Sequence, residues 1–184
     1  MKVKPDRIEK FKKIASKIKD NTPILLTQLD PDAKAGGREM RYIFKKEFGK
    51  ELPIIYGGAF DDPQNQAIRN IFDVDDFMIP VTDVSLSNDL GNVILVDSSV
   101  SAKKENRIQG KTYNPVIVVD HHVGSDLEEN DSTFIWTDPK AGSATTMVTE
   151  LMRNLGMKIE IDDEFRDVAT MAALGIFTDT TKFS

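Results

Sequence analysis

Apolar residues recur at helical spacing near the start of the chain. Ile8, Phe11, Ile14, Ala15 and Ile18 stand three or four positions apart, with lysines between them, which is the pattern of an amphipathic helix. Glycines close two later segments of similar periodicity, as is typical of helix ends. The helices predicted from these patterns cover residues 7–19, 40–48, 63–72, 143–155 and 162–174.

Short apolar runs of strand length separate these helices. Residues 93–96 and 116–119 consist only of valine, isoleucine and leucine, the pattern of strands that are buried on both faces. Similar runs occupy residues 23–27, 52–56 and 133–136. Strands that alternate with helices form βαβ units and a mainly parallel sheet. The sequence therefore predicts one α/β domain, residues 1–184, with a mainly parallel Rossmann-like sheet flanked by helices.

Acidic residues follow three of the predicted strands. Asp30 and Asp32 come soon after the first strand, Asp97 directly follows the run at 93–96, and Asp120 directly follows the run at 116–119. Sites in open α/β sheets form beyond the carboxyl ends of the strands. We therefore expect these side chains to meet at one rim of the sheet.

Two adjacent histidines add an imidazole to this rim. His121 and His122, the only histidines of the chain, directly follow Asp120, and neighbouring side chains at a strand end point to different sides. One could bind a metal ion while the other faces a substrate. Carboxylates with one imidazole suit Mn²⁺ or Mg²⁺ and do not exclude zinc. Asp179, between two threonines, is the last candidate ligand, and the set favours metal-assisted hydrolysis.

Each of these residues also has an ordinary structural explanation. Asp97 could cap a helix or form a turn with the serines that follow it, the two histidines could lie on a surface loop, and Asp179 could be a solvated acid. For a single aspartate the ordinary explanation is favoured. It weakens when several such residues are expected to converge.

Composition removes several other classes of function. The chain has no cysteine, which excludes disulfides, Cys-rich zinc sites and thiol nucleophiles. Its formal net charge is −6, so attraction to nucleic-acid backbone is not a property of the whole surface. Phosphate-loop, dinucleotide-binding and nucleophile-elbow motifs are absent. A polar N-terminus and the lack of a long apolar run predict a cytoplasmic protein that has no membrane partner.

Four segments resemble, in order, the motifs of the DHH phosphoesterase superfamily. Residues 27–37 resemble motif I, 93–99 motif II, 118–122 the name-giving Asp-His-His motif III, and 175–183 motif IV. The superfamily includes RecJ-type nucleases, oligoribonucleases, cyclic-dinucleotide phosphodiesterases and exopolyphosphatases. The resemblance implies the N-terminal domain of that family and a hydrolase that uses Mn²⁺ or Mg²⁺, two ions or one. Its substrate would be a nucleotide or short-oligonucleotide phosphoester.

The resemblance also implies a role for each residue of the rim. Asp97 would bridge two ions, His121 and Asp179 would complete the shell of one, and Asp32 would serve the other. Asp120 would orient the centre from outside it, and His122 would face the substrate phosphate. A metal-bound water would be the nucleophile.

Motif I departs from the common His-x-x-x-Asp-x-Asp form. Gln28 replaces the histidine and Lys34 replaces the second aspartate, and an ammonium there could repel a second ion or take its place. In the RecJ-like form, Asp30 and Asp32 would both remain ligands. Two outcomes follow: a hydrolase, or a catalytically impaired domain that binds a nucleotide, nucleic acid or protein partner without turnover. A regulatory module whose acids are only helix caps is disfavoured by the order of the four motifs.

The expected partners are a phosphorylated small molecule, a nucleotide or a short single-stranded nucleic acid. The sequence leaves open whether the chain also forms a homodimer. Residues 172–184 run from an apolar segment into Asp and Thr residues and then stop. We therefore expect a truncated chain, followed in nature by the C-terminal substrate-binding domain that the family normally adds.

Overall fold

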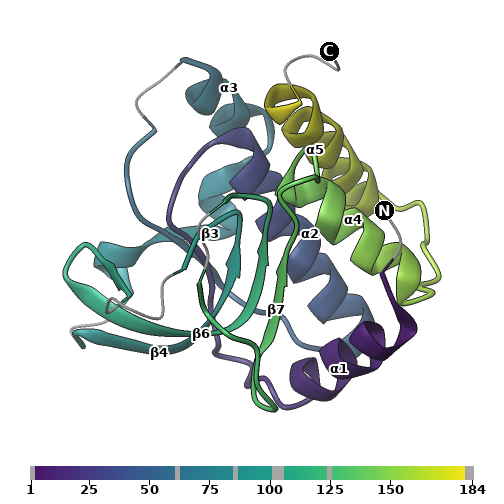
Figure 1. Cartoon of the computed structure of the whole chain (residues 1–184). Helices are drawn as coiled ribbons and strands as arrows, with labels where there is room; N and C mark the ends of the chain where they lie inside the picture. The colour runs from purple at the N-terminus through teal and green to yellow at the C-terminus, as the bar shows by residue number, and fades with distance from the viewer. Residues whose placement is uncertain (1–2, 61–62, 85–86, 101–105, 124–125, 181–184) are drawn as a thin grey trace.

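The computed structural model describes residues 3–60, 63–84, 87–100, 106–123 and 126–180. Within them, a seven-stranded sheet has the order β3-β2-β1-β4-β6, with β5 and β7 both paired to β6 (Figure 1). All pairs are parallel except the hairpin of β5 and β6. The predicted fold class is therefore confirmed. The strands are β1 Ile24–Leu26, β2 Ile54–Tyr56, β3 Met78–Pro80, β4 Asp89–Val96, β5 Arg107–Ile108, β6 Lys111–Asp120 and β7 Phe134–Thr137.

Three of the helices begin at residues whose side chains satisfy a free N–H group. Asp30 caps α2, Ser143 caps α4 and Asp162 caps α5, each through a side-chain oxygen that accepts from a backbone N–H three residues on. Helix α2 contacts β1, α4 and α5, and so links the sheet to the outer helices (Figure 1). The helices are α1 Pro5–Ala15, α2 Pro31–Phe48, α3 Pro63–Ile71, α4 Ala144–Asn154 and α5 Asp163–Asp179, with short 3₁₀ helices at Val74–Asp76 and Val81–Asp83.

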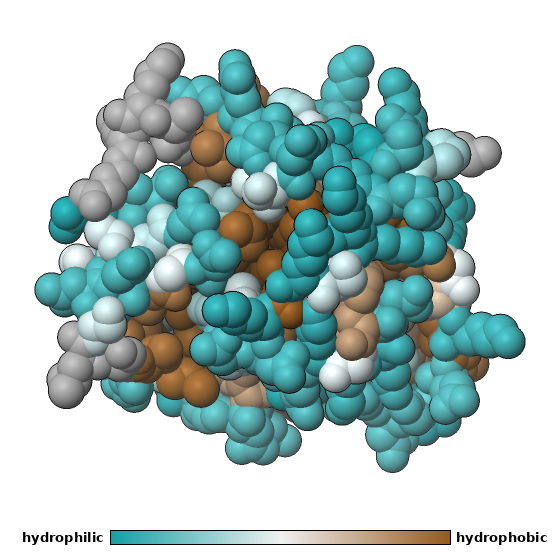
Figure 2. All heavy atoms as spheres, turned by 90° about the horizontal axis from the view of Figure 1, so that it is seen from below, coloured by the Kyte–Doolittle hydropathy of each residue, from teal (hydrophilic) through white to brown (hydrophobic). Residues whose placement is uncertain are grey.

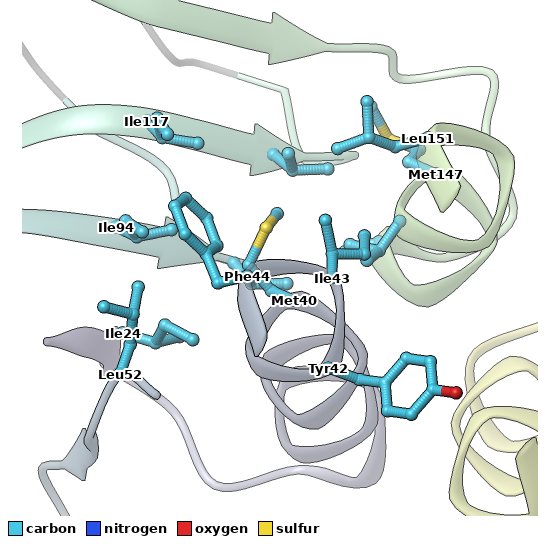
Figure 3. Packing of buried hydrophobic residues seen from close by; sticks show 14 of the residues in the cluster. Ile24, Met40, Tyr42, Ile43, Phe44, Leu52, Ile94, Ile117, Met147 and Leu151 are labelled. Atoms are coloured by element: carbon cyan, nitrogen blue, oxygen red, sulfur yellow. The ribbon is translucent and has the colours of Figure 1, made fainter. Parts of the chain in front are cut away.

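The core lies mainly between the sheet and the helices. Successive strand residues point to opposite faces, so Ile24 belongs to the large cluster under the helices and Leu25 to a smaller cluster on the other face. Figure 3 shows Ile24 and Ile94, from neighbouring strands, on the side where Met40 and Phe44 of α2 pack. This packing fixes α2 against the centre of the sheet.

Strand order reverses between β1 and β4. From β1 the chain moves outward to β2 and β3, then returns to the other side of β1 as β4 and continues to β6 and β7. Such a reversal leaves a crevice at the carboxyl ends of the two central strands, where ligands bind in open α/β sheets. Asp30 follows β1 and Asp97 follows β4, so both stand at this crevice.

Helix α2 begins at Pro31, so the start predicted at residue 40 is wrong. Gly36 and Gly37, which precede the predicted start, lie within the helix and allow close packing. A Cβ atom at Gly36 would lie 2.7 Å from Val96 Cγ1, and one at Gly37 would lie 2.9 Å from Leu26 Cδ2. The helix therefore passes the ends of β1 and β4 at a distance that only glycine allows.

Helix α5 continues beyond the predicted residue 174 to Asp179. The Thr178 and Thr180 hydroxyls donate to backbone carbonyls three or four residues earlier in the helix, so these threonines fit the last turn. Asp179 thus stands at a helix end and not on an extended segment.

The apolar pattern does not predict two short strands, β3 and β5. Strand β3 has three residues and β5 has two, and each lies at an edge of the sheet. The hairpin of β5 and β6 turns at Gln109 and Gly110, whose φ angles are 47° and 82°; two consecutive left-handed residues suit a tight turn.

The surface seen from below the view of Figure 1 is mainly hydrophilic, with hydrophobic atoms visible in recesses between polar side chains (Figure 2). This side is opposite α3 and the end of α5, which lie at the top of Figure 1. Among the residues that the structure describes, no helix combines the length and apolarity that crossing a membrane would require.

Glu39 is a buried acid where α2 packs on α4. Its side chain accepts from Thr149 Oγ1 at 2.9 Å and 3.1 Å through its two oxygens. Burial raises the pKa of Glu39 from 4.5 to about 8, against the opposing effect of Thr149. The carboxyl group is therefore protonated at neutral pH in the folded protein.

We expect Glu39→Gln to change how stability depends on pH. As pH rises from 5 to 8, the unfolded wild-type chain loses the Glu39 proton while the folded protein keeps it until about 8, so wild-type stability falls. The variant lacks this loss, and its stability relative to wild type should rise by roughly 3 kcal/mol across this window. Urea unfolding of metal-free protein at both pH values measures the change. The exposed Glu47→Gln serves as the control, and a Glu39→Gln curve parallel to wild type would contradict the prediction.

Candidate metal centre

Three carboxylates surround one ring nitrogen of His121. Its Nε2 atom lies 3.1 Å from Asp179 Oδ2, 3.3 Å from Asp97 Oδ1 and 3.7 Å from Asp32 Oδ2. The four residues come from α5, the loop after β4, the first turn of α2 and the segment after β6. The structure therefore brings together four of the five residues that the sequence predicts as metal ligands.

Two atoms at the middle of this cluster lack hydrogen-bond partners. Among the described residues, Asp97 Oδ1 and His121 Nε2 are buried and neither makes a hydrogen bond. Asp97 is only 1% exposed. An unsatisfied buried carboxylate oxygen is costly, and a cation held between it and the imidazole would satisfy both atoms. The donor set thus fits a divalent metal ion.

Asp97 also has an unusual backbone. Its φ angle is +57°, a left-handed conformation that aspartate and asparagine adopt more readily than most residues. Its N–H donates to the carbonyl of Val119 at 2.9 Å, which ties this residue to the neighbouring strand β6. Strained residues of this kind persist where the surrounding structure fixes them, often at functional sites.

The start of α4 holds Asp32 in place. Asp32 Oδ2 accepts from the Ala144 N–H at 2.7 Å and Oδ1 from the Thr145 N–H at 2.9 Å, while Thr145 Oγ1 donates to the Asp32 carbonyl at 3.0 Å. Burial and the charge of Asp97 raise the pKa of Asp32 to about 7 despite these bonds. Asp32 therefore both accepts from the first two N–H groups of α4 and faces the cluster. The sequence indicates this helix start, and only the structure shows the role of Thr145.

The pKa values of the groups at the centre are shifted because several carboxylates lie close together. Burial raises the pKa of Asp97 and of Asp179, and the charge of Asp30 adds to both shifts. The close approach of Asp97 raises the pKa of His121 to about 9, although burial opposes this shift. Protons on these groups relieve repulsion among the acids. A divalent ion would take the place of those protons.

His122 lies beside this cluster, with its Nδ1 atom 3.5 Å from Asp97 Oδ1, and is held by Asp120. His122 Nδ1 lies 2.8 Å from Asp120 Oδ1, and Ser99 Oγ donates to Asp120 Oδ2 at 3.3 Å. Burial lowers the pKa of His122, but the contact with Asp120 and the charge of Asp97 outweigh it, so the net shift is upward. The His122 side chain is 41% exposed whereas that of Asp120 is fully buried. Asp120 thus orients an imidazole that faces solvent.

Asp30 has a different place from the other predicted ligands. Its Oδ1 atom accepts from the Ala33 N–H at 2.8 Å and caps α2. Among the described residues, the groups of atoms close enough to share an ion are Asp97, His121 and His122, and Asp32, His121 and Asp179, so Asp30 belongs to neither. Its charge nevertheless acts on Asp97 and Asp179, so it lies near the centre. Gln28 is exposed.

Lys34 is fully buried on the first turns of α2. Its ammonium group donates to Asn65 Oδ1 of α3 and lies 5.2 Å from the centre of the Phe60 ring. Lys34 therefore points toward α3, whereas Asp32 points toward α4. No pattern in the sequence predicts that Asn65 and Phe60 receive this lysine.

Comparison with known proteins agrees with this architecture. The model of the DHH family, N-terminal domain, matches residues 10–176. The cyclic-di-AMP phosphodiesterase GdpP of Bacillus subtilis (strain 168) is 29% identical over 109 residues, which are 59% of this chain and 16% of that protein. The crystal structure of an exopolyphosphatase-related protein from Bacteroides fragilis has the same fold, with a TM-score of 0.64 and 18% identity, over 98% of this chain and 52% of that one.

This chain spans about half the length of the similar crystal structure and a much smaller share of GdpP. The family match covers the ends of β1, β4 and β6 and most of α5. These are the elements whose acids and imidazole meet at the rim of the sheet. The chain belongs to the DHH family and carries the N-terminal domain of that family.

Proposed function

We propose that this chain is a metal-dependent phosphoesterase domain that hydrolyses a phosphoester of a nucleotide or short oligonucleotide. The observation that carries the proposal is the buried pair of Asp97 Oδ1 and His121 Nε2, 3.3 Å apart and without hydrogen-bond partners. Asp32 and Asp179 complete a set of oxygen and nitrogen donors of the kind that Mn²⁺ or Mg²⁺ prefers. The similar proteins are named as a phosphodiesterase and an exopolyphosphatase-related protein, which agrees with a phosphoester substrate.

A divalent ion at this site would supply Lewis acidity toward a phosphoryl oxygen and lower the pKa of water. Asp32, Asp97, His121 and Asp179 would hold it. The start of α4 keeps Asp32 in position, and the link to β6 does the same for Asp97.

His122 is the residue that we assign to the substrate phosphate. Its Nδ1 atom faces Asp120, which leaves the outer nitrogen of the partly exposed ring to donate a hydrogen bond to a phosphate oxygen. The Asp120 carboxylate fixes the direction of that donor and favours the protonated ring.

A short substrate suits the net charge of −6, because long nucleic acids need an extended basic surface. We also propose that the protein acts in the cytoplasm.

A Mn²⁺ titration combined with a hydrolysis assay tests the proposal. We expect saturable binding of Mn²⁺ that raises the melting temperature, and Mn²⁺-dependent cleavage of bis(4-nitrophenyl) phosphate and of short oligonucleotides. His122→Gln should keep Mn²⁺ binding and lose about 100-fold in turnover, as expected for loss of a charged hydrogen-bond donor to the phosphate. A protein whose melting temperature does not respond to Mn²⁺ would contradict the proposed centre.

One observation favours a second candidate function. Lys34, which replaces the second aspartate of motif I, is fully buried on the first turns of α2, and the α4 amides bond both oxygens of Asp32. The lysine offers no carboxylate to a metal ion, and the amide bonds weaken Asp32 as a ligand. Binding of a nucleotide, nucleic acid or protein partner without turnover is therefore the alternative. Saturable Mn²⁺ binding without hydrolysis of any of these phosphoesters would select it.

A further inference from the structure

The segment that joins α4 to α5 presents apolar side chains to solvent. Residues 157–161, which we call the connecting segment, have the sequence Met-Lys-Ile-Glu-Ile and form neither a helix nor a strand. Ile159 is 42% exposed and Ile161 is 73% exposed. Single exposed apolar residues are common on protein surfaces, whereas neighbouring ones can mark an interaction site. The connecting segment is therefore a candidate contact surface.

The charged residues of the connecting segment lie toward α2. Lys158 and Glu160 line a hollow of about 200 Å³ together with Tyr42 and Lys46 of that helix. Successive side chains of an extended chain point to opposite sides, so the isoleucines are turned outward. A segment that only covered the surface would have the reverse pattern, with its apolar side chains against the protein and its charges in solvent.

The backbone of the connecting segment is also open to a partner. Within the described part of the chain, its one backbone–backbone hydrogen bond runs from the Asp162 N–H to the Glu160 carbonyl at 2.9 Å. That oxygen has a second lone pair, and the remaining N–H and C=O groups resemble those at the free edge of a sheet. The connecting segment lies at the right-hand edge of Figure 1, at the beginning of α5. A second chain could therefore reach it.

The sequence of the connecting segment is complementary to itself when two copies run antiparallel. If Ile159 lies opposite Ile159 of a second copy, Lys158 falls opposite Glu160 and Met157 falls opposite Ile161. The same pairs recur on the other side of the two-fold axis, as an isologous contact requires. Opposite charges and apolar side chains that face each other across antiparallel strands stabilise the pair. Both kinds of pair are present in this register.

We propose that the connecting segment is a self-association site, at which two copies of this chain pair as antiparallel strands about Ile159. The proposal is independent of the hydrolase activity. A pair of five-residue strands buries less than the roughly 1,200 Å² of a stable interface, so the association is weak and depends on concentration. Asp179 lies at the far end of α5, which has 17 residues and a length of about 25 Å. Pairing at the connecting segment therefore leaves the metal centre open.

Charge reversal within the connecting segment tests the proposal. Sedimentation velocity over a range of concentrations should show wild-type chains passing from monomer to dimer. Lys158→Glu places two glutamates opposite each other at each charged pair, and Glu160→Lys places two lysines there. Each variant alone should associate at least about 10-fold more weakly than wild type. An equimolar mixture of the two variants restores opposite charges, as does the double variant, and both should associate as wild type does.

Two further variants separate this pairing from general effects. Ile159→Asp places two carboxylates at the centre of the pair and should abolish the dimer. Glu47→Lys makes the same change in net charge as Glu160→Lys at an exposed position of α2 and should associate as wild type. The substituted positions of the connecting segment are exposed, so each variant should fold, and an unchanged melting temperature of the monomer checks this.

Each other outcome would overturn the proposal. Wild-type chains that stay monomeric at every concentration would leave the connecting segment to a different partner. A dimer that all these variants form equally well would lie at another surface of the chain. Weak association in both single variants without recovery in their mixture would exclude the antiparallel register. Equal weakening in Glu47→Lys would show that net charge, and not the connecting segment, governs association.

Discussion

Asp97→Asn is expected to abolish the stabilisation of this protein by Mn²⁺ and to leave the fold intact. Asp97 Oδ1 is the buried oxygen without a partner, 3.3 Å from His121 Nε2, so its negative charge contributes directly to holding a cation. Loss of a mere outer-shell partner weakens metal binding by about 10–100-fold, and loss of this ligand should cost more than 100-fold. Asparagine adopts the left-handed conformation that this position requires (φ +57°). The change thus removes charge without adding backbone strain.

The melting temperature with and without Mn²⁺ measures this effect. At a free Mn²⁺ concentration 100 times the wild-type Kd, the ion should stabilise wild type by about 2.7 kcal/mol and a variant of 100-fold lower affinity by about 0.4 kcal/mol. Without metal, the variant should be as stable as wild type or more so, because one of several crowded carboxylates is gone. Asp89→Asn, an exposed acid at the opposite end of β4, is the control. An unchanged response to Mn²⁺ in Asp97→Asn would refute the site.

Gly175→Ala is expected to destabilise the protein and to weaken metal binding together. A Cβ atom at Gly175 would lie 2.8 Å from Ala35 Cβ, 3.1 Å from the Pro31 carbonyl oxygen and 3.1 Å from Thr145 Oγ1. Two of these neighbours belong to α2 and the third is the residue that holds Asp32. Alanine favours a helix over glycine by about 1 kcal/mol, but overpacking against backbone costs about 1–3 kcal/mol. We expect a net loss of about 1 kcal/mol.

Relief of this clash would move α5 away from α2, and with it Asp179, which lies one turn further along the helix. Mn²⁺ affinity should therefore fall by about 10–100-fold, as when a ligand loses its support. Urea unfolding and a Mn²⁺ titration of the same sample measure the two effects. Ala173→Leu adds bulk at an exposed position of α5 and should change neither beyond about 0.5 kcal/mol. Normal Mn²⁺ affinity in a destabilised Gly175→Ala would show that the packing does not position Asp179.

Much of the site could be predicted because strand ends are local features. The apolar runs that precede Asp97 and His121 indicate buried parallel strands, and such strands bring the residues that follow them to one rim. The position of Asp179 could not be predicted from a strand end, because it depends on the length of α5, which extends beyond the predicted residue 174. The sequence also does not predict that Asp32 both faces the cluster and holds the start of α4. Its partners there, the N–H groups of Ala144 and Thr145, are more than a hundred residues away.

The helix boundaries likewise depend partly on local sequence and partly on tertiary packing. Gly36 and Gly37 indicate a break when only local propensity is considered, but they lie within α2 because the helix must pass close to Val96 and Leu26. Tertiary packing overrides the local preference there. Lys34 is a comparable case: the sequence shows that it replaces an acid, and only the structure shows that Asn65 receives its side chain.

The sequence alone therefore determined the mainly parallel α/β fold and the residues that could form a metal centre, because buried strands and the polar residues at their ends are encoded over a few neighbouring positions. Only the tertiary structure decided that Asp97 Oδ1 and His121 Nε2 are left without partners, that Asp30 lies outside the groups that could share an ion, and that Lys34 faces α3. These outcomes depend on distances between segments that are far apart in the chain. Such distances are set by how α2, α4 and α5 pack together, and local sequence patterns do not record them.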